Sequence, residues 1–483
     1  MKLRKYLSLF LVVCLLFAFA LPVLATESEP EAAPEEEAPS TDVAESATSS
    51  IFNSSVDAAL LLEMNTDTVL YSKNADEQMY PASLTKIMTC LLVLEHGNLD
   101  DIITVPASAL EGLEVGAEMD IDHHLQAGEQ MRLEDMLYYL MLESANEACI
   151  VVAQHIAGSL EGFVSMMNQK AQELGCTGTH FVNPHGLHDE EHYTTANDLM
   201  KITLHALENE TFCTITNSAS YDLPATNMQE GRKLSSTNQL INDKMANNAY
   251  FYSKASGIKT GFTTPAGRCL ISTATNENLH LLSIILKAET LEDENGNWVY
   301  RSFPETINLF EWGFEQYRIS TVMSTLYPVA EIPVNMAAGA ETVALAPVQE
   351  VRTLMRSNYD HDKVVLDVKL YQPSVDAPVE AGQVLGSVTV SYDGEVLGSS
   401  QLAAITGIAL SEITHQASEA KTYVEDHWWK WLVGILIGIA VVIIVCFFLL
   451  QYYRRQQRRR KVVARRRALE LQRRRREWNL PED

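Results

Sequence analysis

Ser83 and Lys86 are the first residues in the chain whose types and spacing suit catalysis. They stand three residues apart in segment 81–86, PASLTK, and apolar residues then recur at helical spacing up to Gly97. Positions i and i+3 share a helix face, so we expect the Lys86 amine beside the Ser83 hydroxyl. A serine needs an adjacent base to act as a nucleophile, and a lysine is a base only where its amine is held neutral. The alternative is a capped helix start with a solvated lysine.

Two more polar motifs follow in elements that are otherwise apolar. Ser144 and Asn146 lie in a break between predicted helices, one over 133–142 and one that continues to Ala157. Lys259, Thr260 and Gly261 lie on the first of two strands predicted within 256–275. A glycine inside a strand often marks a place where another backbone comes close. The simpler readings are a serine helix cap and an exposed strand end.

The order Ser-x-x-Lys, Ser-x-Asn, Lys-Thr-Gly is typical of penicillin-binding proteins and class A β-lactamases. Over roughly 53–412 the chain resembles the serine D-alanyl-D-alanine carboxypeptidases, which are low-molecular-mass penicillin-binding proteins of peptidase family S11. The segments that carry the resemblance are YPASLTKIMT at 80–89, LESANEA at 142–148, HFVNPHGL at 180–187 and GIKTG at 257–261. The chain departs from the family with Ala145 in the middle motif, with Phe262 where several members have histidine, and with SSTN at 235–238, where some members place an arginine.

The resemblance implies a serine mechanism on the terminal D-alanyl-D-alanine of peptidoglycan stem peptides. Ser83 is then the nucleophile, Lys86 takes its proton, and Ser144 relays a proton to the leaving amine. β-Lactams are expected to acylate Ser83 and to leave slowly. Neither a cofactor nor a metal ion is expected.

The substrate-binding residues implied by the resemblance flank this centre. Asn146 holds the substrate and orients Lys86, while Lys259 adds positive charge that favours a neutral Lys86 and attracts the terminal carboxylate. Thr260 donates a hydrogen bond to that carboxylate, and Gly261 lets the substrate backbone lie against the strand. The backbone N–H groups of Ser83 and Phe262 form the oxyanion hole.

Other activities remain open at this point. A transpeptidase, a D,D-endopeptidase and a β-lactamase share the acyl-enzyme and differ in acceptor or bond. A catalytically silent cell-wall-binding protein is a different class, and the intact set of motif residues argues against it.

Histidines and cysteines offer no convincing metal site. His185, His188 and His192 lie in a loop without the His-Glu-x-x-His helix pattern, so we expect structural or surface roles. Five cysteines lie outside the terminal apolar segments and form no Cys-x-x-Cys pair, so we read most of them as small buried hydrophobes, with one disulfide left open. They are Cys90, Cys149, Cys176, Cys213 and Cys269.

Charge is distributed very unevenly along the 483 residues. The net charge is -27, yet residues 451–483 hold 13 Lys and Arg against 4 Asp and Glu. The large central part is therefore strongly acidic, which makes nucleic acid an unlikely partner. The basic tail is expected to set topology and to touch anionic lipid.

The resemblance implies a catalytic α/β (α+β) domain of the β-lactamase/transpeptidase type, with an antiparallel sheet flanked by helices. Composition and pattern predict an all-β domain after it and then a single transmembrane helix. The catalytic domain faces outward from a bacterial cell membrane and the tail lies in the cytoplasm. The expected segments are a signal peptide (1–25), an acidic disordered linker (26–52), the catalytic domain (53–317), the all-β domain (318–412), a juxtamembrane segment (413–427), the transmembrane helix (428–450) and the basic tail (451–483).

Overall fold

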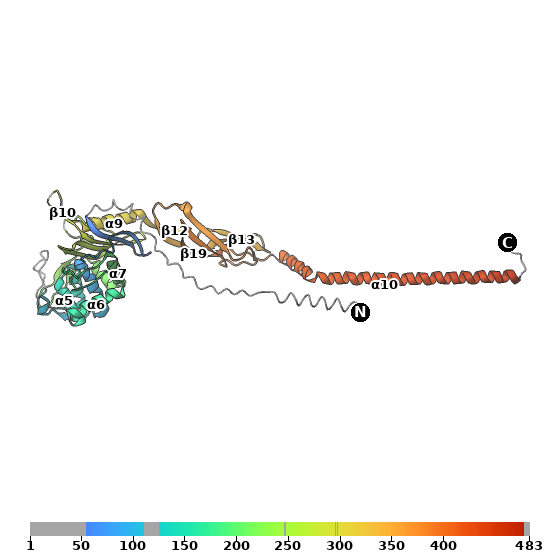
Figure 1. Cartoon of the computed structure of the whole chain (residues 1–483), viewed down its shortest axis with the longest axis horizontal. Coiled ribbons are helices and arrows are strands. Elements are labelled where there is room, and N and C mark those ends of the chain that lie inside the picture. The colour runs from blue at the N-terminus through green and yellow to red at the C-terminus, as the bar shows by residue number, and fades with distance from the viewer. Residues whose placement is uncertain (1–54, 111–124, 246–247, 295, 297, 478–483) are drawn as a thin grey trace, which may run out of the picture.

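A computed structural model describes residues 55–110, 125–245, 248–294, 296 and 298–477. The expected signal peptide and acidic linker lie outside these residues. Figure 1 shows a mixed helix-and-sheet domain, a β-rich domain and one long helix, following each other along the long axis. The two domains and the apolar helix occur in the order that the sequence predicts.

The catalytic domain is built on a five-stranded antiparallel sheet of strand order β2-β1-β9-β8-β7. Side chains of β1 alternate between its two faces: Leu60 and Leu62 join one core, and Ala59 and Leu61 join another. Its strands are β1 (Val56–Glu63), β2 (Thr68–Lys73), β7 (Ala255–Thr263), β8 (Gly267–Asn276) and β9 (Leu279–Ala288). Because the order ends on β7, one edge of the sheet is the strand that carries Lys-Thr-Gly.

Helices cover both faces of this sheet, as predicted. The face with the larger apolar core packs against the helices α3 (Lys86–His96), α4 (Leu133–Leu142), α5 (Asn146–Ala157), α6 (Leu160–Glu173), α7 (Ala196–Leu207) and α8 (Glu210–Thr216). The other face packs against α9 (Ser302–Gln316), whose Leu309 and Phe310 are fully buried. Each face therefore has its own apolar core.

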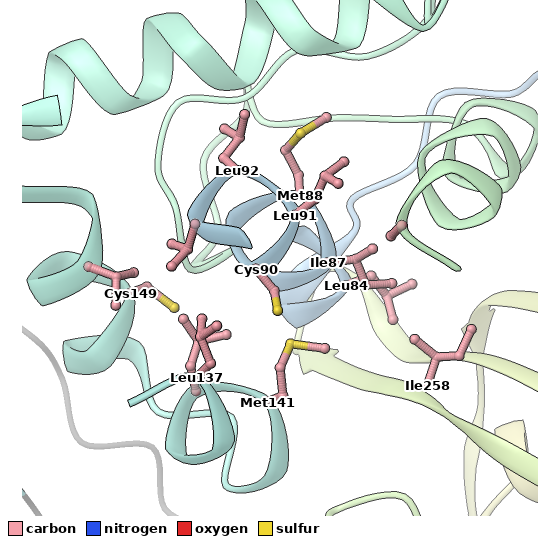
Figure 2. Packing of buried hydrophobic residues seen from close by; sticks show 14 of the residues in the cluster. Leu84, Ile87, Met88, Cys90, Leu91, Leu92, Leu137, Met141, Cys149 and Ile258 are labelled. Carbon is pink, nitrogen blue, oxygen red and sulfur yellow. The ribbon is translucent and has the colours of Figure 1, made fainter. Parts of the chain in front are cut away.

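Helix α3 is surrounded by the larger core. It follows the short 3-10 turn η1 (Ala82–Thr85). Figure 2 shows its apolar side chains together with those of η1, α4, α5 and β7: Leu84, Ile87, Met88, Cys90, Leu91, Leu92, Leu137, Met141, Cys149 and Ile258. Among the described residues every cysteine is free, and four of the five in question are buried, which confirms their interpretation as buried hydrophobes.

Short elements complete the catalytic domain. They are β3 (Ile102–Thr104) paired with β4 (Gln130–Arg132), β5 (Ser220–Leu223) paired with β6 (Arg232–Ser235), β10 (Thr290–Glu292) paired with β11 (Trp298–Tyr300), and the 3-10 turn η2 (Ala107–Leu110). The sequence did not predict the β5–β6 hairpin or α8.

The second domain is all-β apart from one 3-10 turn, η4 (His361–Lys363). Its main sheet has six strands in the order β16-β18-β19-β14-β13-β17. The predicted hairpin at Asp393-Gly394 is present, with Tyr392 paired to Glu395. The strands are β12 (Tyr317–Met323), β13 (Ala330–Asn335), β14 (Thr342–Pro347), β15 (Val351–Arg356), β16 (Val364–Leu370), β17 (Val375–Asp376), β18 (Val384–Tyr392) and β19 (Glu395–Ala404).

A single helix, α10 (Glu412–Glu477), forms the C-terminal part. The helix is long and apolar enough to cross a membrane, and its apolar stretch is not buried against the rest of the described protein. The helix also includes the residues expected as juxtamembrane segment and basic tail, for which the sequence predicted no structure.

Candidate active site

The Lys86 amine lies at the centre of the first motif. Its Nζ is 2.9 Å from Ser83 Oγ, 2.8 Å from Asn146 Oδ1 and 2.7 Å from the His185 carbonyl oxygen. Asn146 Oδ1 and the carbonyl can only accept, so they take two N–H bonds of a neutral amine. The single lone pair of the neutral amine then points at the Ser83 hydroxyl, which is the arrangement a general base needs.

Burial explains how Lys86 can be neutral. The side chain is fully buried, and this loss of solvation lowers the pKa of its amine below the ordinary value of 10.5. Cys149 and Glu147 act in the opposite direction. The effect of burial prevails, so the amine loses its proton more readily than a lysine in water.

The loop 180–192 packs against η1 and α3, next to Ser83. The Thr89 hydroxyl donates to the Pro184 carbonyl at 2.6 Å, which fixes the loop to α3. Gly186 has a φ of 84°, and a Cβ there would lie 1.8 Å from the carbonyl oxygen of Ala82. Only glycine fits this approach. The loop was recognised as family-like in sequence, but the contact between Gly186 and the Ser83 turn was not.

Histidines of this loop have protein partners. His192 is buried, with Nε2 2.8 Å from Thr85 Oγ1 and Nδ1 accepting from the Val182 N–H at 3.2 Å. Burial lowers the pKa of His192 to about 4 and that of His185 to about 3, so both rings are neutral near pH 7. His188 packs edge-on against Tyr80. These contacts agree with the structural roles that the sequence suggested.

The middle motif forms the bend between α4 and α5. Ser144 is half-buried with a φ of 60°, a left-handed conformation that costs energy in a non-glycine residue. Ala145 is the N-cap of α5, so Ser144 is not a helix cap. Asn146 begins the helix and reaches Lys86. Within the described part of the chain, the Ser144 hydroxyl has no hydrogen bond to Ser83 or Lys86.

Strand β7 brings the third motif against the nucleophile turn. A Cβ on Gly261 would lie 3.1 Å from the Ser83 nitrogen and 3.1 Å from the Pro81 carbonyl oxygen. The bare backbone of β7 is therefore adjacent to the Ser83 N–H. Lys259 is also buried, and burial lowers the pKa of its amine well below 10.5; repulsion from Lys86, whenever Lys86 is protonated, acts in the same direction.

Thr237 is a site residue that the sequence did not single out. Its hydroxyl lies 2.7 Å from the Thr260 hydroxyl, and its N–H donates to the Leu142 carbonyl at 3.1 Å. The first contact joins it to Lys-Thr-Gly, and the second joins it to the end of α4, just before Ser144. The Thr237 and Thr260 hydroxyls therefore lie side by side at the strand to which the resemblance assigns binding of the substrate carboxylate.

Phe262 lies at the open rim of the site. Its side chain is 43% exposed, and the Arg268 guanidinium stacks 4.0 Å from its ring and 3.9 Å from the Tyr300 ring. Of the predicted residues, the structure brings Ser83, Lys86 and Asn146 into direct contact and places Gly261 against the Ser83 turn. The strand β7 carries Lys259, Thr260 and Phe262.

Comparison with known proteins places this arrangement in a family. The profile described as D-alanyl-D-alanine carboxypeptidase, peptidase family S11, matches residues 43–290, about half of the chain. The chain belongs to the D-alanyl-D-alanine carboxypeptidase family. A second profile, the C-terminal domain of penicillin-binding protein 5, matches residues 322–409 in the all-β domain.

Individual relatives agree with the family assignment. The D-alanyl-D-alanine carboxypeptidase DacF of Bacillus subtilis is 31% identical over 353 residues, which cover 72% of this chain and 84% of the relative. A D-alanyl-D-alanine endopeptidase of Pseudomonas aeruginosa is 31% identical over 236 residues, covering 48% and 71%. The crystal structure of penicillin-binding protein 5 from Haemophilus influenzae superposes with a TM-score of 0.50 at 25% identity, covering 74% of this chain and 98% of that chain.

Proposed function

We propose that this protein is a membrane-anchored serine D-alanyl-D-alanine carboxypeptidase that removes the terminal D-alanine from peptidoglycan stem peptides. Family membership supports the activity and the substrate class. One observation carries the choice of residues: the buried Lys86 amine lies 2.9 Å from Ser83 Oγ, while Asn146 Oδ1 and the His185 carbonyl accept both hydrogens of the neutral amine. In this proposal Ser83 is the nucleophile and Lys86 its base.

Acylation follows from this arrangement. Ser83 Oγ bonds to the carbonyl carbon between the two D-alanines, and its proton passes to Lys86 Nζ. The backbone N–H groups of Ser83 and Phe262 hold the oxyanion. The carbon–nitrogen bond then breaks as Lys86 returns the proton to Ser144 and Ser144 donates its own proton to the leaving amine, so that free D-alanine departs.

Substrate recognition uses the edge of β7. The terminal carboxylate accepts hydrogen bonds from the hydroxyls of Thr260 and Thr237, with the positive charge of Lys259 beneath them. Asn146 holds the peptide on the other side. Water then attacks the acyl-enzyme ester, which restores Ser83. A β-lactam forms the same ester but hydrolyses slowly.

The helix α10 supports the proposed topology. The apolar stretch 431–450 lacks charge, tryptophans precede it, and arginines follow it. By the positive-inside rule the basic end stays in the cytoplasm, and both folded domains face outward. In that orientation the active site is on the side of the membrane where peptidoglycan lies.

The decisive experiment measures release of D-alanine from a peptide ending in D-Ala-D-Ala by the full chain in detergent. A Ser83→Ala variant is compared in the same assay, together with labelling by a fluorescent penicillin. We expect release and labelling with Ser83 and neither with Ser83→Ala. Labelling without release would instead favour a transpeptidase or endopeptidase, and loss of both in the intact protein would contradict the proposal.

A further inference from the structure

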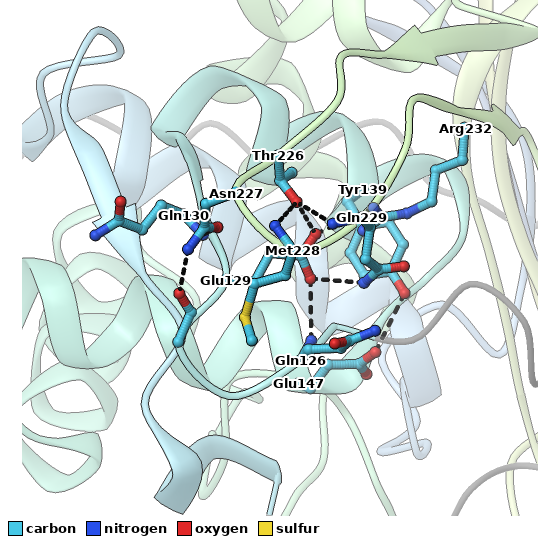
Figure 3. A network of polar contacts seen from close by, with 11 residues as sticks. Gln126, Glu129, Gln130, Tyr139, Glu147, Thr226, Asn227, Met228, Gln229 and Arg232 are labelled. Carbon is cyan, nitrogen blue, oxygen red and sulfur yellow. Dashed lines mark hydrogen bonds and ion pairs between the residues drawn. The ribbon is translucent and has the colours of Figure 1, made fainter.

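Glu147 follows Asn146, which contacts Lys86, and has no part in the mechanism above. It is the second residue of α5, next to Asn146, and its exposed fraction is 7%. Its Oε1 accepts a hydrogen bond of 3.3 Å from the Tyr139 hydroxyl of α4 (Figure 3). A nearly buried carboxylate is costly unless something compensates for it.

A second buried carboxylate has its own cation. Glu129 is fully buried and pairs with Arg232 of β6 at 3.1 Å. It also accepts hydrogen bonds from the Thr226 hydroxyl at 3.0 Å and from Gln229 Nε2 at 2.8 Å (Figure 3). The charges of Glu129 and Arg232 therefore offset each other.

Arg232 also connects this pair to Tyr139. Its guanidinium lies 5.7 Å from the centre of the Tyr139 ring. Within the described residues, its buried Nε and Nη2 have no hydrogen-bond acceptor. The free part of this cation therefore adjoins the tyrosine that donates to Glu147. A continuous set of contacts runs from Glu129 through Arg232 and Tyr139 to the first turn of α5.

Several ionisable groups lie near the buried lysines Lys86 and Lys259. Burial raises the pKa of the Cys149 thiol to about 12 and that of the Tyr139 hydroxyl beyond its ordinary range, so both are neutral near pH 7. His185 is neutral as well. Glu143 is only half-buried and accepts from the Ser235 N–H, so solvent screens its charge more strongly. Glu147 is then the buried carboxylate whose charge acts on Lys86.

We propose that Glu147 is a positioning residue for catalysis, which fixes the first turn of α5 behind Asn146 and offers a negative charge to the buried Lys86. This inference rests on the proposed function, because it assigns a task within the Ser83–Lys86 centre. Asn146 lies in that turn, and its Oδ1 is 2.8 Å from Lys86 Nζ, so the position of the turn sets the position of the base.

The same charge acts after proton transfer. Once Ser83 has attacked, Lys86 carries the serine proton in a site closed to solvent, where an ammonium ion is costly without a negative partner. Glu147 stabilises this state by its negative charge, which agrees with its opposing effect on the lowered pKa of Lys86. Loss of the charge should therefore both ease deprotonation of the resting amine and disfavour the protonated intermediate.

The test is the pH dependence of acylation by a fluorescent penicillin, using the full chain in detergent. In Glu147→Gln the amide oxygen still accepts from Tyr139, and only the charge is lost. We expect its acidic limb to move to lower pH by about one pH unit, and its plateau rate to fall by about tenfold. Glu147→Asp, which keeps the charge, should return the limb toward the wild-type position.

Two further variants separate charge from packing. Tyr139→Phe should slow acylation by a few-fold without moving the limb, since the carboxylate stays. Glu161→Gln alters an exposed glutamate in the first turn of α6 and should change nothing. A Glu147→Gln limb at the wild-type position, in protein whose thermal unfolding is normal, would overturn the inference. Failure of the wild type to be labelled at all would instead contradict the proposed function.

Discussion

The two folded domains treat buried charge in opposite ways. The catalytic domain buries lysines and carboxylates in its interior, among them Lys86, Lys259, Glu129 and Glu147. In the described part of the all-β domain, the buried polar residues are two serines, Ser320 and Ser400. Burying charge costs stability, so a domain that does so repeatedly has a function that needs it. The all-β domain has a core that packing alone explains.

The largest expected effect comes from removing the Lys86 amine, which is the proposed general base. Lys86→Met keeps a chain of similar shape but has no amine to accept the serine proton. General bases contribute about 100- to 10,000-fold, so we expect penicillin acylation to fall by about 1,000-fold. Stopped-flow labelling measures this rate. An acylation rate within about tenfold of the wild type would show that another group takes the proton.

The same variant has a predicted effect on stability. The folded state lowers the pKa of Lys86, whereas the unfolded chain keeps its proton up to about 10.5. Between these two values the unfolded chain binds more protons, so this lysine makes the protein more stable as pH rises. Urea unfolding at several pH values should show a smaller increase in Lys86→Met. An equal slope in both proteins would mean that Lys86 remains protonated in the fold.

A smaller effect is expected at the rim of the site. Thr237→Val removes the hydroxyl that lies 2.7 Å from the Thr260 hydroxyl and keeps the side-chain shape. A hydrogen bond to a charged group contributes about 1.5–3 kcal/mol, so KM for a peptide ending in D-Ala-D-Ala should rise about tenfold, with kcat little changed. The control is Thr211→Val, on α8. Thr226→Val is not suitable as a control, because the Thr226 hydroxyl donates to Glu129. An unchanged KM would remove Thr237 from carboxylate recognition.

The sequence predicted contacts within one motif better than contacts between segments that are far apart in the chain. The spacing of Ser83 and Lys86 was sufficient to place their side chains together, although Ser83 lies on a 3-10 turn rather than in α3 itself. The family resemblance implied the antiparallel sheet with helices on both faces. The alternating and helical patterns predicted individual strands and helices and the all-β domain. Such features depend on local periodicity, which one sequence displays.

Contacts between distant segments left no comparable signal. Thr237 lies on a stretch without clear periodicity, and only the fold brings it beside Thr260. Arg232 lies on a short hairpin strand that pattern did not predict, so its pairing with Glu129 was not foreseen. Gly186 was visible as part of a motif, but its need for a missing Cβ depends on the Ala82 carbonyl, which is about a hundred positions away.

The smallest effect on catalysis is expected in the all-β domain. Leu345 is fully buried there, and Leu345→Ala should destabilise that domain by about 2–5 kcal/mol. Leu309→Ala is the matched change in the catalytic domain, where Leu309 is equally buried on α9. Penicillin labelling after brief heating reports the fold around Ser83. Leu309→Ala should lower the temperature at which labelling is lost, and Leu345→Ala should leave it nearly unchanged. If both variants lower it equally, the domains unfold together. Ile319 and Leu354, on strands β12 and β15, pack against the core beneath α9 and would be the route of that coupling.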